Sequence, residues 1–182
     1  MKTLLLLALL GVWSSPYAAP APRTNLLACH LGGGNKVTLI SESHGLDGQA
    51  LFLKVNGSTE KAFQDFPDTN FVGNVALSKC VGNILVYVLN YGTPYLKGAI
   101  VRFNPDTSRI EKTNFAEKSL PAWIYVGAHG NLVIIPTQGY GETDKKYVIY
   151  RFVAGIGQNE QPEFSNNLPS AEGYRVIRIR SK

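Results

Sequence analysis

The stretches GGGNKVTLI (32–40), VGNILVYVL (81–89) and HGNLVIIPT (129–137) each contain a Gly-Asn pair followed by an apolar run. The glycines of these pairs, Gly34, Gly82 and Gly130, are separated by a constant 48 residues. A fixed period of about 20 to 50 residues is typical of repeat architectures, in which each repeat is one supersecondary unit. The spacing therefore predicts three structural units of about 48 residues.

Three further features recur in nearly the same register. An aromatic residue or His precedes Gly after each apolar run, at His44-Gly45, Tyr91-Gly92 and Tyr140-Gly141. A second apolar run then carries a cation, which is Lys54, Arg102 or Arg151. Finally, Leu120-Pro121 and Leu168-Pro169 repeat, with Phe66-Pro67 as a looser first copy.

Strand patterns dominate within the units. Residues alternate in VIYRF (148–152) and YRVIRI (174–179), and Gly, Pro, Asn and Asp mark the turns between short apolar runs. We therefore expect an all-β protein of three tandem four-stranded repeats, at residues 26–73, 74–121 and 122–170, followed by a C-terminal strand at 174–180. Such units fit the blades of a β-propeller, and three of them also fit a β-trefoil or a β-prism.

The stretches GNILVYV (82–88), GAIVRFNPDTSRIEK (98–112), GNLVIIP (130–136) and KYVIYRF (146–152) resemble blades of β-propeller proteins. The resemblance covers roughly residues 26–170 and implies the fold alone. Propeller enzymes of the lactonase kind use carboxylates and Asn around a metal in a central channel. No carboxylate recurs here at a fixed repeat position, so the resemblance does not carry that activity to this chain.

The N-terminus has the pattern of a secretory signal peptide. Met1-Lys2-Thr3 is followed by the apolar run LLLLALLGVW and then by small residues. We expect cleavage after Ala18, which leaves 19–182 as a single domain that is periplasmic or secreted and not integral to a membrane. Leu26-Leu27-Ala28-Cys29 has the form of a lipoprotein box, but the polar segment SSPYAAPAPRTN separates it from the apolar run, which disfavours lipidation.

The chain contains two cysteines, Cys29 and Cys80, which lie close to one repeat apart. In an oxidising compartment an even pair predicts a disulfide. Equivalent strands of successive units are neighbours in a stacked or radial repeat, so this bridge would join the first unit to the second.

The formal net charge of +5 comes without a run of Lys and Arg, which argues against nucleic acid as a partner. Arg175, Arg178 and Arg180 cluster near the C-terminus, where we expect them to protect an edge strand.

Catalytic and metal-binding motifs are not recognisable in the sequence. Ser43, His44 and Asp47 supply the residue types of a hydrolytic triad, but triads are built from separate elements that meet in space. Neither G-x-S-x-G nor metal-ligand spacing of Cys or His occurs, and His129 is expected in the turn before Gly130. We expect no catalytic residues, no metal and no cofactor.

The recurring turns are the remaining candidate site. If the units surround an axis, their rings would lie on one face beside polar neighbours, and amphipathic rings are common anchors in recognition sites. The predicted binding residues are His44, Asn90, Tyr91, Tyr95, Tyr140, Glu142 and Asp144. The alternative is that these rings only cover the ends of hairpins.

These observations favour an exported, non-catalytic protein that binds and inhibits another protein, as immunity-type proteins do. A carbohydrate-binding module is the second hypothesis, because three equivalent sites would gain avidity for a sugar. A propeller-type hydrolase is the third. Three blades are also too few to close a usual propeller, so the protein either closes as a compact threefold or completes itself as a homo-oligomer.

Overall fold

The structure is a computed structural model that describes residues 22–44, 48–63, 73–92, 94–137 and 143–179. Every regular element in these ranges is a β-strand, which confirms the all-β prediction. The strands form three antiparallel sheets that follow one another along the chain. The expected signal peptide, residues 1–18, lies outside the described residues.

Sheets 1 and 2 are four-stranded meanders in which each strand pairs with the next. Sheet 1 contains β1 (Arg23–Gly32), β2 (Asn35–His44), β3 (Gly48–Val55) and β4 (Ser58–Lys61). Sheet 2 contains β5 (Val75–Val81), β6 (Ile84–Gly92), β7 (Tyr95–Asn104) and β8 (Arg109–Glu117).

Sheet 3 has the strand order β12-β11-β10-β9-β14, with β13 also paired to β11. Its strands are β9 (Trp123–Gly127), β10 (Gly130–Pro136), β11 (Tyr147–Val153), β12 (Gly157–Gln158), β13 (Glu163–Ser165) and β14 (Arg175–Arg178). Because β12 and β13 pair with successive parts of β11, together they take the place of one interrupted fourth strand. The C-terminal β14 adds a strand on the other side, against β9.

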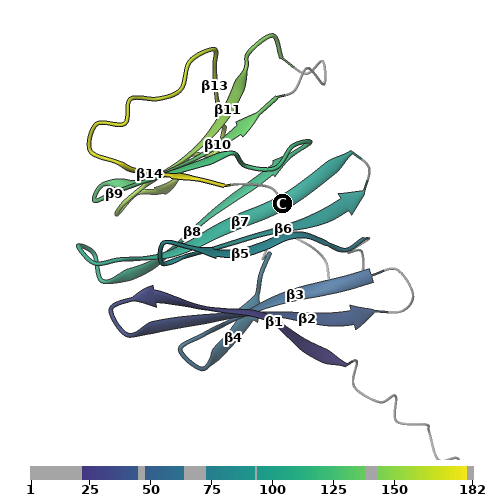
Figure 1. Cartoon of the computed structure of the whole chain (residues 1–182). Coiled ribbons are helices and arrows are strands. Elements are labelled where there is room, and N and C mark those ends of the chain that lie inside the picture. Colours follow the sequence, from purple (N-terminus) through teal and green to yellow (C-terminus); the bar gives the residue numbers. More distant parts are fainter. Residues whose placement is uncertain (1–21, 45–47, 64–72, 93, 138–142, 180–182) are drawn as a thin grey trace, which may run out of the picture.

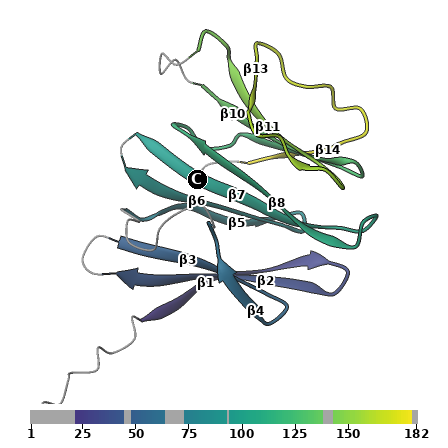
Figure 2. The ribbon, with the colours of Figure 1, turned by 180° about the vertical axis from the view of Figure 1, so that it is seen from behind.

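The three sheets are stacked face to face, with sheet 2 in the middle (Figures 1 and 2). One apolar cluster joins sheets 1 and 2, and a second joins sheets 2 and 3. Three units around one axis, as in a β-trefoil or β-prism, would bring the first and third units together. In the described residues no apolar cluster does so, and the sheets form an open row.

Strand β6 is buried on both faces because it lies at the centre of this stack. Its residues Ile84 to Leu89 are each at most 1% exposed. Leu85, Tyr87 and Leu89 pack toward sheet 1, whereas Ile84, Val86 and Val88 pack toward sheet 3. A continuous apolar run replaces the usual alternation because both faces contact protein.

The Gly-Asn pairs mark the first hairpin of each sheet, but they occupy different positions in it. Gly82-Asn83 are the two turn residues between β5 and β6, both at positive φ. Asn35 instead begins β2, and Gly130 begins β10 after a turn made by Ala128 and His129. At Gly130 a Cβ atom would lie 1.9 Å from the carbonyl oxygen of Phe152, so this glycine is required by close backbone approach.

The far side of sheet 3 is covered by the chain itself. Tyr125, Leu132, Ile134 and Ile149 form a third buried cluster there, and Tyr174 packs on Tyr125 with ring centroids 5.9 Å apart. The segment that carries Tyr174 connects β13 to β14 and passes over this side of the sheet (Figure 1).

The predicted disulfide between Cys29 and Cys80 is present, and it joins β1 of sheet 1 to β5 of sheet 2. Cys29 is 2% exposed and belongs to the cluster between the two sheets. The bond indicates an oxidising, extracytoplasmic environment.

Reduction of this disulfide should lower the stability of the protein. The bridge closes a loop with a sequence separation of 51 residues. A loop of that size contributes about 4 kcal/mol in the chain-entropy model. We expect guanidinium unfolding to shift to a lower midpoint when dithiothreitol is present, and the Cys29→Ser, Cys80→Ser variant should match the reduced protein. Coincident curves for the oxidised and reduced protein would contradict this expectation.

Tyr87 should make the stability of the protein sensitive to alkaline pH. Its side chain is fully buried and its hydroxyl donates a hydrogen bond to the carbonyl oxygen of Ala62 at 2.9 Å. Burial, and secondarily the charge of Glu60, raises the pKa of Tyr87 well above its ordinary value. The unfolded chain ionises this phenol near pH 10, so stability is complete below that pH and decreases above it.

The Tyr87→Phe variant tests this linkage. Losing the hydrogen bond should cost about 1 kcal/mol at neutral pH, while the decrease above pH ~10 should become smaller than in the wild type. Urea unfolding at a series of pH values measures both effects. An unchanged slope above pH ~10 would show that Tyr87 is not responsible.

Candidate binding site at the turn end

The three predicted turns connect β2 to β3, β6 to β7 and β10 to β11. The strand ends next to these connections lie at the same end of the stack (Figure 1). We call this the turn end. His44 is the last residue of β2, and Tyr91 lies near the end of β6. Tyr140 and Glu142 fall outside the described residues, and for His44 only the backbone is described.

The hairpin of β6 and β7 supplies most of the described part of this site. Asn90 is held by its backbone, because its N–H donates to the carbonyl oxygen of Asn74 at 2.9 Å. Tyr91 is half-buried, whereas Tyr95 is 50% exposed. The Lys118 ammonium lies 5.4 Å from the centre of the Tyr95 ring, in position for a cation–π contact. Tyr95 is therefore an exposed ring whose position is supported by a cation.

A groove of about 340 Å³ lies at the turn end between sheets 2 and 3. Its lining is mostly apolar and consists of Leu77, Leu96, Lys118, Ser119, Leu120, Pro121, Ala122, Pro136 and Ile179. Lys118 both lines the groove and contacts the Tyr95 ring. The Ser119 hydroxyl has no hydrogen-bond partner among the described residues. The turn end thus combines an exposed aromatic ring with an apolar groove of side-chain size.

Asp144 contributes a carboxylate to the connection between β10 and β11. It is exposed and forms an ion pair with Lys145, with Nζ and Oδ2 3.1 Å apart. An exposed pair of this kind contributes little to stability, so both groups are accessible to a partner.

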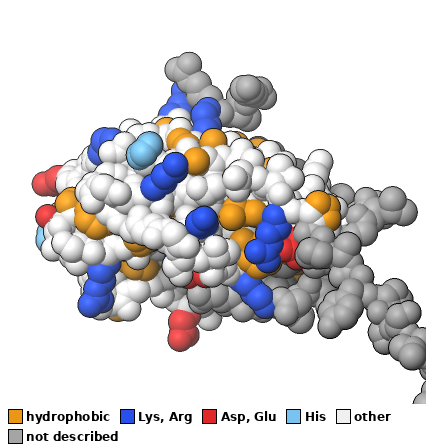
Figure 3. Space-filling view, turned by 90° about the horizontal axis from the view of Figure 1, so that it is seen from below, with side chains coloured by type: hydrophobic (Ala, Val, Ile, Leu, Met, Phe, Trp, Pro, Cys, Tyr) orange, Lys and Arg blue, Asp and Glu red, His pale blue; other side chains and the backbone are white. Residues whose placement is uncertain are grey.

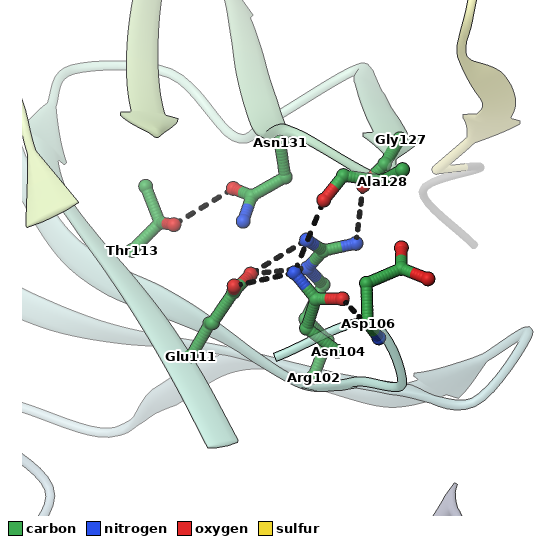
Figure 4. A network of polar contacts seen from close by, with 8 residues as sticks. All are labelled: Arg102, Asn104, Asp106, Glu111, Thr113, Gly127, Ala128 and Asn131. Atoms are coloured by element: carbon green, nitrogen blue, oxygen red, sulfur yellow. Dashed lines mark hydrogen bonds and ion pairs between the residues drawn. The ribbon is translucent and has the colours of Figure 1, made fainter. Parts of the chain in front are cut away.

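The most concentrated polar cluster lies elsewhere, between sheets 2 and 3 (Figure 4). The Arg102 Nε donates to Glu111 Oε2 at 2.7 Å, and the Asn104 amide donates to Glu111 Oε1 at the same distance. Arg102 also donates to the carbonyl oxygen of Gly127, and Asn104 to that of Ala128, at 3.0 and 3.2 Å. These two carbonyls belong to the end of β9 and the turn after it. The cluster therefore connects the end of sheet 2 to the first hairpin of sheet 3.

This cluster is structural in character. Arg102, Asn104 and Glu111 are 3%, 0% and 5% exposed, and their groups bind one another or backbone. Nearby, the Thr113 hydroxyl donates to the side-chain amide oxygen Oδ1 of Asn131 at 2.7 Å, which gives the same interface a second polar contact. Both carboxylate oxygens of Glu111 accept hydrogen bonds, one from Arg102 and one from Asn104, so this group holds the cluster together.

No group of three or more potential metal ligands occurs among the described residues. Cys29, beside His30, is oxidised in the disulfide and so does not offer a thiolate. His129 lies in the turn before Gly130, as expected from the sequence.

Two lysines at or near the turn end are not evident from the sequence. Lys118 lies shortly before the repeated Leu120-Pro121 pair. It belongs to the site because its ammonium contacts the ring of Tyr95 on the adjacent strand β7. Lys97 is 6% exposed, with its ammonium 5.1 Å from the centre of the Phe63 ring. Alternation places Lys97 on the same face of β7 as Ala99, the face that packs toward sheet 1.

Comparison of the chain with protein-family models, with curated proteins and with solved structures gives no significant match. Within the part of the chain that the structure describes, no helix has the length and apolar character needed to cross a membrane.

The Arg102–Glu111 pair should show the asymmetry typical of buried ion pairs. Replacing one partner, as in Glu111→Leu or Arg102→Met, leaves a buried group without its counter-charge and should cost about 3–5 kcal/mol. The double variant Arg102→Met, Glu111→Leu should recover much of this loss, because both charges are removed together. Urea unfolding of the four proteins in a double-mutant cycle measures the coupling, and additive losses would contradict the assignment.

Proposed function

We propose that this chain is an exported, non-catalytic binding protein, periplasmic or secreted, that recognises another protein through the turn end. The disulfide is consistent with such a compartment, as is the signal-peptide pattern at the N-terminus. The expected role is inhibition of the partner, because the described residues offer a rigid stapled scaffold and the sequence offers no catalytic motif. The protein acts by covering a surface of its partner.

The observation that carries this proposal is that the turn end has both an exposed ring, that of Tyr95, and an apolar groove, and that Lys118 contacts the ring and lines the groove. Interface anchors are enriched in Tyr, and they bind best where a pocket for a partner's side chain lies next to them. The groove of about 340 Å³ is large enough for one apolar side chain of a partner. Lys118 adds one positive charge to its lining.

Carbohydrate recognition is less well supported at this site. Sugar binding requires an aromatic face that is open for stacking, but Lys118 lies over the Tyr95 ring. The groove between sheets 2 and 3 is lined mainly by Leu, Pro, Ala and Ile side chains, which have no groups that form hydrogen bonds with sugar hydroxyls. An apolar side chain of a protein matches that lining better.

The experiment is affinity capture followed by measurement of affinity. The protein from residue 19 onward is immobilised and exposed to envelope extract and culture supernatant, and any retained protein is purified for titration. Tyr95→Ala should weaken binding by about 2 kcal/mol, which is roughly thirtyfold, and Lys118→Ala should weaken it in the same direction.

Phe164→Ala is the matched control, because Phe164 is 53% exposed against 50% for Tyr95 but lies in sheet 3 on β13. Its affinity should remain that of the wild type. The proposal is wrong if no protein is retained, or if the partner binds Tyr95→Ala and Phe164→Ala equally well.

A further inference from the structure

The side of sheet 1 that faces away from sheet 2 is open and carries mostly positive charge (Figure 3). Strand alternation assigns its residues, because Val37 and Leu39 belong to the cluster with sheet 2. Lys36, Thr38 and Ile40 therefore lie on the opposite side. The cross-strand pairs Thr38–Lys54 and Ile40–Phe52 extend this side onto β3.

We call this side the basic face. Its charged and ionisable residues are Arg23, His30, Lys36, Glu42, Lys54 and Lys61. Among the described residues this face has one carboxylate, that of Glu42, which forms an ion pair with Arg23. Among the described residues no carboxylate lies within ion-pair distance of Lys36 or Lys54. Two exposed ammonium groups are thus left for an external anion.

Lys36 and Lys54 line the same shallow groove, of about 570 Å³. The remaining lining residues are Asn25, Gly34, Thr38, Ile40, Asn56 and Gly57. The Asn56 side chain is committed to the turn, because it donates to Asn35 at 2.7 Å and accepts from the Lys36 N–H at 3.0 Å. Asn25 and Thr38 remain as polar side chains between the two lysines and the sheet.

The two terminal segments of the chain do not supply an acidic complement to this face. Residues 1–22 contain no Asp or Glu, and neither do residues 179–182. A second copy is disfavoured because two basic faces would repel each other.

The basic face lacks the exposed apolar side chains that a membrane surface or a stable protein partner would need. A membrane surface favours exposed aromatic or aliphatic side chains that enter the headgroup region. A stable protein interface has an apolar centre. On the basic face Ile40 is 8% exposed, and Phe52 is half-buried with the Arg23 guanidinium 4.9 Å from its ring centre.

We propose that the basic face binds an acidic polysaccharide, a sugar chain that carries carboxylate or sulfate groups. The cations lie on four strands, so the ligand is expected to be extended and to carry several anions. Lys36 and Lys54 bind those anions, while Asn25 and Thr38 bind hydroxyl groups between them. This site is independent of the protein-binding function proposed for the turn end.

The test is titration of the wild-type protein with polygalacturonate and with heparin, in low salt and in added salt. Binding should weaken as salt screens the charges. Lys36→Glu, Lys54→Glu should reduce affinity by at least about tenfold. Arg109→Glu, Arg178→Glu is the control, because it makes the same change of net charge at exposed residues of β8 and β14. It should retain an affinity close to that of the wild type.

A second variant separates sugar recognition from charge alone. Asn25→Ala, Thr38→Ala keeps every charge and should weaken polygalacturonate binding by about threefold or more, with little effect on the salt dependence. Thermal unfolding of each variant checks that it is folded.

Three results would overturn the proposal. The first is the absence of polysaccharide binding by the wild type, and the second is an equal loss in the two charge-reversal variants. The third is binding to polyglutamate, or to vesicles of phosphatidylglycerol and phosphatidylcholine, that is as tight as binding to the polysaccharides. In that case the ligand is an acidic protein or a lipid surface.

Discussion

The burial of sheet 2 on both faces is the constraint on which the rest of the structure depends. Its strand β6 presents Leu85 and Tyr87 to sheet 1 and Ile84 and Val86 to sheet 3. Removing either neighbour would expose a continuous apolar face to water, at a cost of about 25 cal/mol for each Å². The three sheets are therefore expected to fold together, even though each is formed by consecutive strands. The disulfide between sheets 1 and 2 and the Arg102–Glu111 cluster between sheets 2 and 3 each fix one of these two interfaces.

The strands and their order could be predicted from the sequence because they depend on local patterns. Glycine and asparagine mark hairpins, and apolar runs mark strands, so the repeat identified three sheets and the pairing of Cys29 with Cys80. The register could not be predicted in the same way. The Gly-Asn pair forms the turn itself at Gly82 but begins the strand at Gly130, and a one-residue shift reverses the face of every side chain. The face of the sheet on which each side chain lies is therefore known only from the observed strand pairing.

This difference explains which parts of the two sites could be found in advance. The turn end follows from topology, because equivalent connections in stacked meanders lie at the same end. Tyr95 was predicted beside the recurring turns on a different premise, that the units surround an axis, whereas the sheets form an open row. The contact of Lys118 with the Tyr95 ring depends on the register of β7 and β8, in which Leu96 pairs with Glu117, and the repeat spacing does not give this register. The basic face could not be predicted from the sequence either. Lys36 and Lys54 are 18 positions apart, and they share a groove only because β2 and β3 are paired in one register.

The outer faces of sheets 1 and 3, at the two ends of the row, are kept from exposing apolar surface in different ways. A row of repeats needs ends that do not attract further copies, and terminal repeats usually achieve this with a polar outer face. At sheet 3 the chain covers its own apolar surface, with Tyr174 packed on Tyr125. At sheet 1 lysines take that role, since Lys36 and Lys54 keep the outer face hydrated and repel another basic face. A charged end of this kind remains exposed, so the same side chains that would repel a second basic face are available to the anionic ligand proposed above.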